Sequence, residues 1–209
     1  MDTMATSGRP TPDRPTARAR LLAAANELFY KEGVNTVGID RVIERAGVAK
    51  ATLYSAFGSK EELVRAYLAG RQDARRRQIT GVIATHQGPR EQILGIFDAL
   101  GEAISQPDYH GCAFVNASAE ARPGSPITEV TDEHRDWMRE VFTDLGTAAG
   151  AADPAQLSRN LMLLYDGAGV SARLDRDPTA ATSARACAAV LLDAAVAAGT
   201  AAGHRGHQR

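Results

Sequence analysis

The stretch GVNTVGIDRVIERAGVAKATLYSAFGSKEEL, residues 33–63, carries the pattern that decides the fold. Apolar residues recur at helical spacing in its first half, at Val37, Ile39, Val42, Ile43 and Ala46. Gly47 follows them, and a residue without Cβ readily takes the left-handed conformation that ends a helix. The pattern therefore predicts a short helix, a tight turn at Gly47 and a second short helix over residues 49–57.

The second short helix carries small, polar and aromatic side chains in place of one apolar face. A short helix held out by such a turn can enter the major groove of DNA. An ordinary helical hairpin inside an all-α core would also place glycine at a helix end. Order and spacing favour DNA binding, because helix, Gly-Val turn and second helix are followed at once by Gly58, Ser59 and Lys60.

Two further helices are expected to flank this unit. Thr16 can cap the first, Gly33 can end it, and Ser59 can cap a fourth helix that runs to about residue 77. The inner face of the first helix carries Leu21, Leu22, Ala25, Leu28 and Phe29.

Residues 16–70, about a third of the chain, resemble the amino-terminal domain of the tetracycline-repressor (TetR) family of transcriptional regulators. The residues that carry the resemblance are Gly33, Ile39, Val42, Ala46, Gly47, Val48, Thr52, Leu53, Tyr54, Phe57, Lys60 and Leu63. The resemblance implies an all-α protein, with an N-terminal three-helix helix-turn-helix DNA-binding domain and a larger helical ligand-binding and dimerisation domain. It also implies a sequence-specific regulator, most often a repressor, acting as a homodimer on a palindromic operator in double-stranded DNA.

The resemblance assigns residues 49–55 to the helix that reads DNA. The expected DNA-binding residues are Arg41, Lys50, Thr52, Leu53, Tyr54 and Lys60. On this reading Lys50 and Thr52 face bases or phosphates, Leu53 or Ala51 touches a thymine methyl group, and Lys60 holds a phosphate. The chain departs from the family pattern at Gly38, Ala49 and Ala56, where side chains that cap a helix or contact phosphate are usual.

Charge is divided unevenly along the chain, whose formal net charge is −1. Residues 1–87 hold 14 Lys/Arg against 9 Asp/Glu, a net of +5, and residues 88–209 hold 10 against 16, a net of −6. A basic first part is attracted to phosphate, and an acidic remainder is not.

The rest of the chain keeps a helical pattern, with helices expected near 89–106, 110–121, 126–149, 154–174 and 178–199. We expect a disordered arm over residues 1–15, a DNA-binding domain over 16–70, a regulatory and dimerisation domain over 71–200 and a frayed tail over 201–209. No apolar run is expected to span a membrane, the amino terminus lacks an apolar signal core, and two cysteines are too few for a disulfide framework or a zinc site. These features predict a cytoplasmic protein without membrane association.

The resemblance implies that the last two long helices form the homodimer interface. One side of the helix over 154–174 carries Leu157, Leu161, Leu164, Tyr165 and Ala168. The alanine-rich helix over 178–199 presents Ala184, Cys187, Val190, Leu191 and Ala194 for close approach. The alternative is that both helices only pack within one chain.

The resemblance also implies a pocket for an unidentified small-molecule effector among the central helices. The candidate lining residues are Phe97, Phe114, Asn116, Glu120, His134, Trp137, Met138 and Tyr165. Each apolar member is also compatible with ordinary core packing. Asn116 and Glu120 lie four residues apart, so both can point inward as polar anchors or tie neighbouring helices together. Cys112 is either an inert thiol or a sensor of oxidants or electrophiles.

Two other classes of function compete with this reading. An enzyme or carrier is disfavoured, because the sequence has no Ser-His-Asp pattern, glycine-rich phosphate loop or HExxH motif, and no cofactor or metal is expected. An architectural DNA binder without a small-molecule input is disfavoured by the size of the second part. The sequence therefore predicts a regulator and no enzyme.

Overall fold

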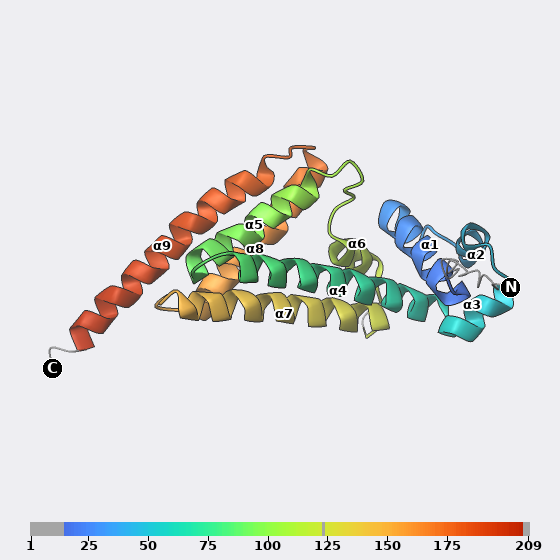
Figure 1. Cartoon of the computed structure of the whole chain (residues 1–209), viewed down its shortest axis with the longest axis horizontal. Helices are drawn as coiled ribbons and strands as arrows, with labels where there is room; N and C mark the ends of the chain where they lie inside the picture. Colours follow the sequence, from blue (N-terminus) through green and yellow to red (C-terminus); the bar gives the residue numbers. More distant parts are fainter. Residues whose placement is uncertain (1–14, 123, 207–209) are drawn as a thin grey trace, which may run out of the picture.

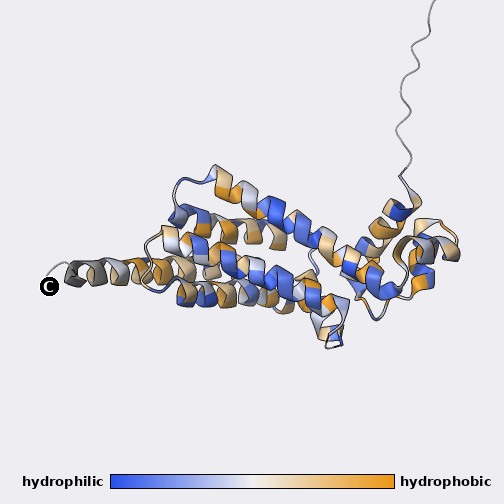
Figure 2. Cartoon of the chain, turned by 90° about the horizontal axis from the view of Figure 1, so that it is seen from below, coloured by the Kyte–Doolittle hydropathy of each residue, from blue (hydrophilic) through white to orange (hydrophobic). Residues whose placement is uncertain are grey.

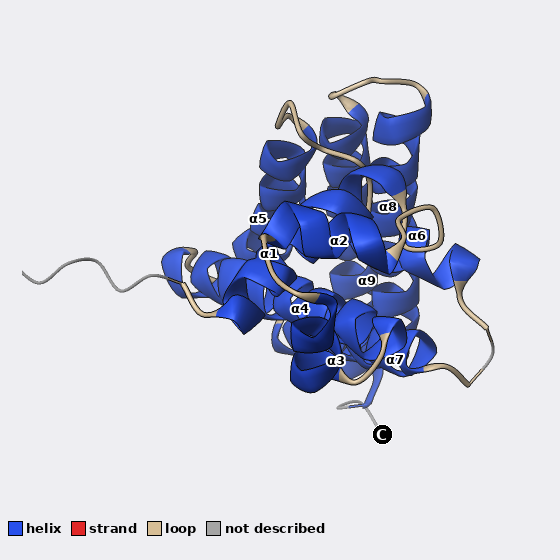
Figure 3. Ribbon diagram, turned by 90° about the vertical axis from the view of Figure 1, so that its right-hand side faces the viewer, coloured by secondary structure: helices blue, strands red, loops and turns tan. Residues whose placement is uncertain are grey.

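The computed structural model describes residues 15–122 and 124–206, and every regular element within these ranges is an α-helix (Figure 3). The predicted all-α fold is therefore confirmed. The predicted arm, residues 1–15, lies outside the described residues except for Pro15. The helices are α1 Ala17–Glu32, α2 Ile39–Ala46, α3 Lys50–Phe57, α4 Lys60–Thr85, α5 Pro89–Ile104, α6 Ala113–Glu120, α7 Pro126–Ala148, α8 Pro154–Leu174 and α9 Ala180–Gly206.

Residues that the sequence predicts to start or end helices do so among the first four helices. The Thr16 hydroxyl accepts a hydrogen bond from the backbone N–H of Ala19 at 3.2 Å, and Ser59 caps α4 through the N–H of Glu62 at 3.1 Å. Gly47 takes the left-handed conformation, with φ 61° and ψ 49°, and ends α2. The chain can therefore turn from α2 into α3 within three residues.

Helices α1–α3 form one end of the molecule, and α4 runs from that end into the helical body (Figure 1). Figure 3 looks onto this end. Side chains of α1–α3 pack with Leu63, Val64, Tyr67 and Leu68 of α4 in one hydrophobic core, which also takes in Phe114 of α6. A second core joins α5, α7, α8 and α9 to Ile79 of α4. The helix α4 thus belongs to both cores.

Two helices are longer than the sequence analysis predicts. α4 continues to Thr85 because the apolar face on which Ile79 lies resumes after the arginines at 75–77, at Val82 and Ile83. α9 continues to Gly206, although we expected it to end near 199 and to be followed by a frayed tail from 201. No proline interrupts this segment, and residues 201–206 are helical. Residues 207–209 lie outside the described residues.

Residues 180–201 of α9 are long and apolar enough to cross a membrane by length and composition alone, so the expectation that no such run exists is wrong. This is weak evidence for a membrane span, since a core helix of a soluble protein passes the same test. Only 17% of the most apolar window is buried, however. The C-terminal part of α9 also extends beyond the other helices (Figures 1 and 2). The chain therefore leaves much of an apolar helix uncovered.

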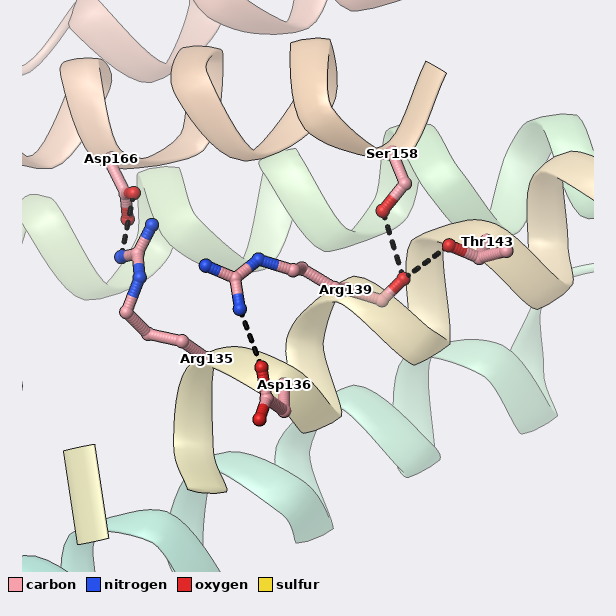
Figure 4. A network of polar contacts seen from close by, with 6 residues as sticks. All are labelled: Arg135, Asp136, Arg139, Thr143, Ser158 and Asp166. Carbon is pink, nitrogen blue, oxygen red and sulfur yellow. Dashed lines mark hydrogen bonds and ion pairs between the residues drawn. The ribbon is translucent and has the colours of Figure 1, made fainter. Parts of the chain in front are cut away.

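α8 packs on α7 with the side that the sequence analysis expects at a dimer interface. Leu157, Leu161 and Ala168 are buried within the chain, so that part of the expectation is wrong. Polar contacts fix the same junction, because the buried Ser158 hydroxyl donates to the carbonyl oxygen of Arg139 at 2.9 Å (Figure 4). The opposite side of α8 is the exposed one.

Leu53 of α3 is fully buried in the first core, with 0% of its surface exposed. We expect Leu53→Ala to lower the free energy of unfolding by about 2–5 kcal/mol, because it removes buried methyl groups and leaves a cavity. Thermal or urea unfolding followed by circular dichroism measures the change. Ser55→Ala, at an exposed position on the same helix, is the control and should change stability by less than about 0.5 kcal/mol. Equal effects of the two substitutions would contradict the packing of α3.

Candidate nucleic-acid interface and ligand cavity

The exposed side of α3 is its candidate DNA-reading face. Tyr54 is 44% exposed, Ala51 and Ser55 are exposed, and Thr52 is half-buried. Leu53 cannot contact DNA, and its prediction as a DNA-binding residue is wrong, because the helix turns this side chain into the core. Ser55, which is not among the expected DNA-binding residues, is exposed on this side, because the helical period places position 55 opposite the buried Leu53.

Neither α2 nor α3 has a side-chain cap at its first turn. Gly38 and Ala49 occupy the two N-cap positions, and neither makes a side-chain capping bond. Backbone N–H groups at such helix starts, together with the helix dipole, favour an anion such as phosphate. The departures from the family pattern therefore leave backbone donors available at this end of the molecule.

Two of the predicted cationic residues are held by carboxylates. Both terminal nitrogens of Arg41 donate to Glu32, at 2.5 and 3.0 Å. The Lys50 ammonium lies 3.1 Å from a carboxylate oxygen of Asp40, and this hydrogen bond raises the pKa of Lys50. Both cations are exposed, so a phosphate can compete with these carboxylates.

Lys60 is the first residue of α4 and is half-buried beside the Ser59 cap. None of the ion pairs found among the described residues involves Lys60. A free ammonium group at a helix N-terminus is suited to a phosphate.

A cavity of about 540 Å³ lies between α1, α4, α5, α6, α7, α8 and the segment that joins α5 to α6. This volume lies in the usual range of small-molecule sites. The apolar part of its wall includes Ala74, Leu100, Ala103, Phe114, Val170 and Leu174. The polar part includes Tyr30, Arg71, Arg75, Gln78, Asp108, Tyr109, Asn116, His134, Tyr165, Asp166 and Arg173.

Half of the predicted lining residues reach this cavity, namely Phe114, Asn116, His134 and Tyr165. Phe97 and Met138 instead lie in the second core, and Trp137 is half-buried with the Arg76 guanidinium 5.3 Å from its ring centre. Glu120 is not part of the cavity wall and accepts a hydrogen bond from Asn35, in the segment between α1 and α2. Helical spacing shows which residues share a face, but the neighbouring helix decides whether that face meets a core or a cavity.

The arginines of the cavity wall were not predicted. Arg71 and Arg75 lie one turn apart on α4, and Arg173 lies on α8. The sequence predicts that α4 ends near residue 77, but this helix continues for two more turns. The apolar residues Ile79, Val82 and Ile83 were the signal that α4 continues beyond residue 77. A longer α4 would have placed Arg75 within the helical body.

Hydrogen bonds join α1 and the segment after it to the cavity wall and to α6 at two points. The hydroxyl of Tyr30, on α1, donates to the carbonyl oxygen of Gly111 at 3.0 Å and accepts from the N–H of His110 at 3.1 Å. At the far end of α6, the backbone N–H of Asn35 donates to the Glu120 carboxylate at 2.6 Å. A displacement of α6 would therefore act directly on the segment between α1 and α2.

Some polar groups of the cavity wall lack partners within the described part of the chain. Arg71 Nε, His134 Nδ1 and the Tyr165 hydroxyl are buried and make no hydrogen bond there. Burial lowers the pKa of His134 to about 4, with help from Arg75, Arg135 and Arg76, so this ring is neutral at pH 7. Burial also raises the pKa of Tyr165, which keeps its proton. Across residues 15–122 and 124–206, no cluster of His, Cys, Asp or Glu is arranged to hold a metal ion.

Known proteins match both parts of the molecule. The family model for bacterial regulatory proteins of the tetR family matches residues 21–67. A TetR-family transcriptional regulator from Streptomyces coelicolor is 34% identical, with a TM-score of 0.82 over 86% of this chain and 96% of that one.

Two regulators of other bacteria match by sequence. The transcriptional repressor KstR2 of Mycolicibacterium smegmatis is 30% identical over 150 residues, which are 69% of this chain and 72% of the repressor. The transcriptional regulator YjdC of Escherichia coli is 25% identical over 154 residues, or 72% of this chain and 80% of the regulator. The helix-turn-helix domain matches the family model, and most of the chain, including the helical body, matches a TetR-family regulator. The chain therefore belongs to the TetR family of DNA-binding transcriptional regulators.

Proposed function

We propose that this protein is a ligand-responsive repressor that acts as a homodimer on a palindromic DNA operator and is released from it by a small molecule in the cavity. The observations that carry the proposal are two hydrogen bonds, one from Tyr30 of α1 to the cavity wall at Gly111, and one that ties α6 through Glu120 to the segment between α1 and α2. They give a ligand in the cavity a direct path to the DNA-binding end.

The proposed DNA contacts combine base reading by α3 with phosphate binding around it. Lys50, Thr52, Tyr54 and Ser55 are the proposed reading and backbone-contacting residues of α3. Arg41 and Lys60 are proposed to bind phosphate, Arg41 by exchanging the Glu32 carboxylate for it. These residues belong to α2, α3 and the start of α4, and α2 and α3 lie at one end of the molecule (Figure 1), which supports this assignment.

The proposed homodimer forms through α8 and α9. Leu163, Leu174 and Val190 are 72%, 74% and 69% exposed, and all three lie on these two helices. Leu163, Gly167, Val170 and Leu174 form one exposed stripe along α8. A second copy would remove this apolar surface from water, together with that of α9. In such a dimer the two DNA-binding domains could read half-sites about one DNA turn, roughly 34 Å, apart.

Ligand response is proposed to work through α4 and α6. A molecule in the cavity touches Arg71 and Arg75 of α4 and Phe114 of α6, while both helices also pack in the core of the DNA-binding end. A small shift of either helix would change the separation of the two α3 helices in the dimer. The ligand then lowers operator affinity because it favours a spacing that no longer fits one DNA turn.

We further propose that the protein works in the cytoplasm as a regulator and not as an enzyme. Membership of a family of transcriptional regulators supports this. The uncovered apolar surface of α9 is then assigned to the partner subunit and not to a membrane.

Binding to DNA from the region upstream of the protein's own gene tests the proposal first. We expect selective binding over scrambled duplex, with two chains per site, at two salt concentrations. Equal, salt-sensitive binding to both duplexes would favour an architectural role or an operator elsewhere. Absence of binding to any duplex at low salt would contradict the assignment of α3.

Lys60→Ala should weaken binding to operator and scrambled duplex alike, because a phosphate contact is independent of sequence. The slope of the logarithm of affinity against the logarithm of salt concentration should flatten by about 0.9. Arg77→Ala is the control, since Arg77 lies about 25 Å further along the same helix, at 1.5 Å per residue. An unchanged slope for Lys60→Ala would remove Lys60 from the interface.

Light scattering during gel filtration tests the dimer. The wild-type protein should show twice the 22.2 kDa chain mass, and Leu163→Arg or Val190→Arg should lower it towards that of one chain. Both positions are exposed in the single chain, so the helical content should be retained. Ala84→Arg, at an exposed position on α4, should leave the dimer intact. A monomeric wild type at micromolar concentration would refute the proposal.

A further inference from the structure

Most of the buried polar atoms that lack a hydrogen-bond partner in the described ranges lie around the cavity. Four buried side-chain nitrogen or oxygen atoms in the described ranges lack a hydrogen-bond partner, and three of them belong to Arg71, His134 and Tyr165 of the cavity wall. The fourth is Nε of Arg20 on α1. A buried polar group without a partner is costly in a native structure. Three of them around one cavity indicate that a ligand completes their hydrogen bonding.

The charges of the cavity wall are unbalanced towards the positive. No ion pair among the described residues neutralises Arg71, Arg75 or Arg173. Arg75 donates to the amide oxygen of Gln78 at 2.9 Å, and Arg173 donates to that of Asn116. Both partners are neutral, so the guanidinium charges remain uncompensated.

The acidic groups of the wall do not cancel this excess. The Asp166 carboxylate is 2.9 Å from Arg135 of α7, in an ion pair seen at the left of Figure 4. Asp108 lies in the exposed segment between α5 and α6. Because one acid is already paired and the other is exposed to solvent, the cavity has a net positive wall.

The arginines are also held in place for recognition. The Arg71 guanidinium carbon lies 3.8 Å from the centre of the Tyr30 ring and 5.7 Å from that of Tyr67, so two aromatic rings fix its plane. Arg75 lies one helical turn further along α4 and faces the same space. Two guanidinium groups at this spacing can together donate several N–H groups to one oxyanion.

The rest of the wall is suited to an apolar ring. Phe114 and His134 stack with their ring centres 3.8 Å apart and their planes within 8° of parallel. Leu100 and Ala103 add aliphatic surface. Since His134 is neutral at pH 7, this side of the cavity carries no added charge.

We propose that the effector is an amphipathic organic anion, with a ring-bearing apolar body and one carboxylate or sulfonate group. Arg71 and Arg75 bind the oxyanion, the Tyr165 hydroxyl donates to the ligand, and the apolar body lies against Phe114, Leu100 and Ala103. The inference deepens the proposed ligand response and rests on it only for the effect on DNA. A cation would meet three uncompensated guanidinium groups and is disfavoured.

Two fluorescent probes separate charge from apolar character. Anilinonaphthalene sulfonate carries one oxyanion, and N-phenylnaphthylamine has the same ring system without the charge. Trp137, the only tryptophan in the chain, can report binding by energy transfer because its ring lies 6.1 Å from that of His134. We expect one sulfonate probe per chain, bound at least about tenfold more tightly than the neutral probe.

Substitutions then locate the site. Arg75→Gln should lower the affinity for the anionic probe by roughly tenfold and leave that for the neutral probe unchanged, since it removes one charge-assisted contact. Arg77→Gln, exposed on the same helix and outside the cavity wall, is the matched control and should leave both affinities unchanged. Arg71→Gln should act like Arg75→Gln, although loss of its stacking on Tyr30 can also affect folding. Melting temperatures check that each variant is folded.

The outcomes distinguish this inference from the proposed function. Equal affinity for the two probes, binding of neither, or equal losses in Arg75→Gln and Arg77→Gln would overturn the anionic effector. Selective binding of the sulfonate probe that requires Arg75 would support it, even where operator binding is unchanged. Operator binding that the bound probe leaves unchanged would count against the proposed ligand response. The release of labelled operator measures that response separately.

Discussion

The continuity of α4 is the constraint on which the rest of the structure depends. Its first half contributes Leu63, Val64 and Leu68 to the core of the DNA-binding end, and Ile79 in its second half packs in the core of the body. Because one unbroken helix belongs to both cores, neither can move along this axis without displacing the other. Arg71 and Arg75 lie on the segment between them, where α4 also forms a wall of the cavity.

A second connection runs through α6, which is short and borders both the cavity and the DNA-binding end. Phe114 faces the cavity and also packs in the first core, while Glu120 accepts a hydrogen bond from the backbone of Asn35. Tyr30 adds a third contact, bonded to Gly111 and stacked against Arg71. Phe114 and Tyr30 therefore belong both to the cavity wall and to the contacts with the DNA-binding end.

The two surfaces proposed to meet partners are stabilised in different ways. At the DNA-binding end, exposed cations are paired with Glu32 and Asp40, and an exposed pair contributes little stability, so exchange for phosphate costs little. On α8 and α9 the exposed groups are apolar, and their cost in water is removed only by burial. The first surface suits a reversible, salt-dependent contact and the second a lasting one.

The sequence by itself determined the helical class, the caps at Thr16 and Ser59 and the turn at Gly47, because these depend on local hydrogen bonds and backbone conformation. It also identified Lys50, Tyr54 and Lys60 as candidates through the family motif. Tertiary structure alone decided that Leu53 is buried, that Leu163 and not Leu161 is exposed, and that Arg71 and Arg75 face a cavity. Helical periodicity shows which residues share a face, but what that face meets depends on helices distant in the sequence.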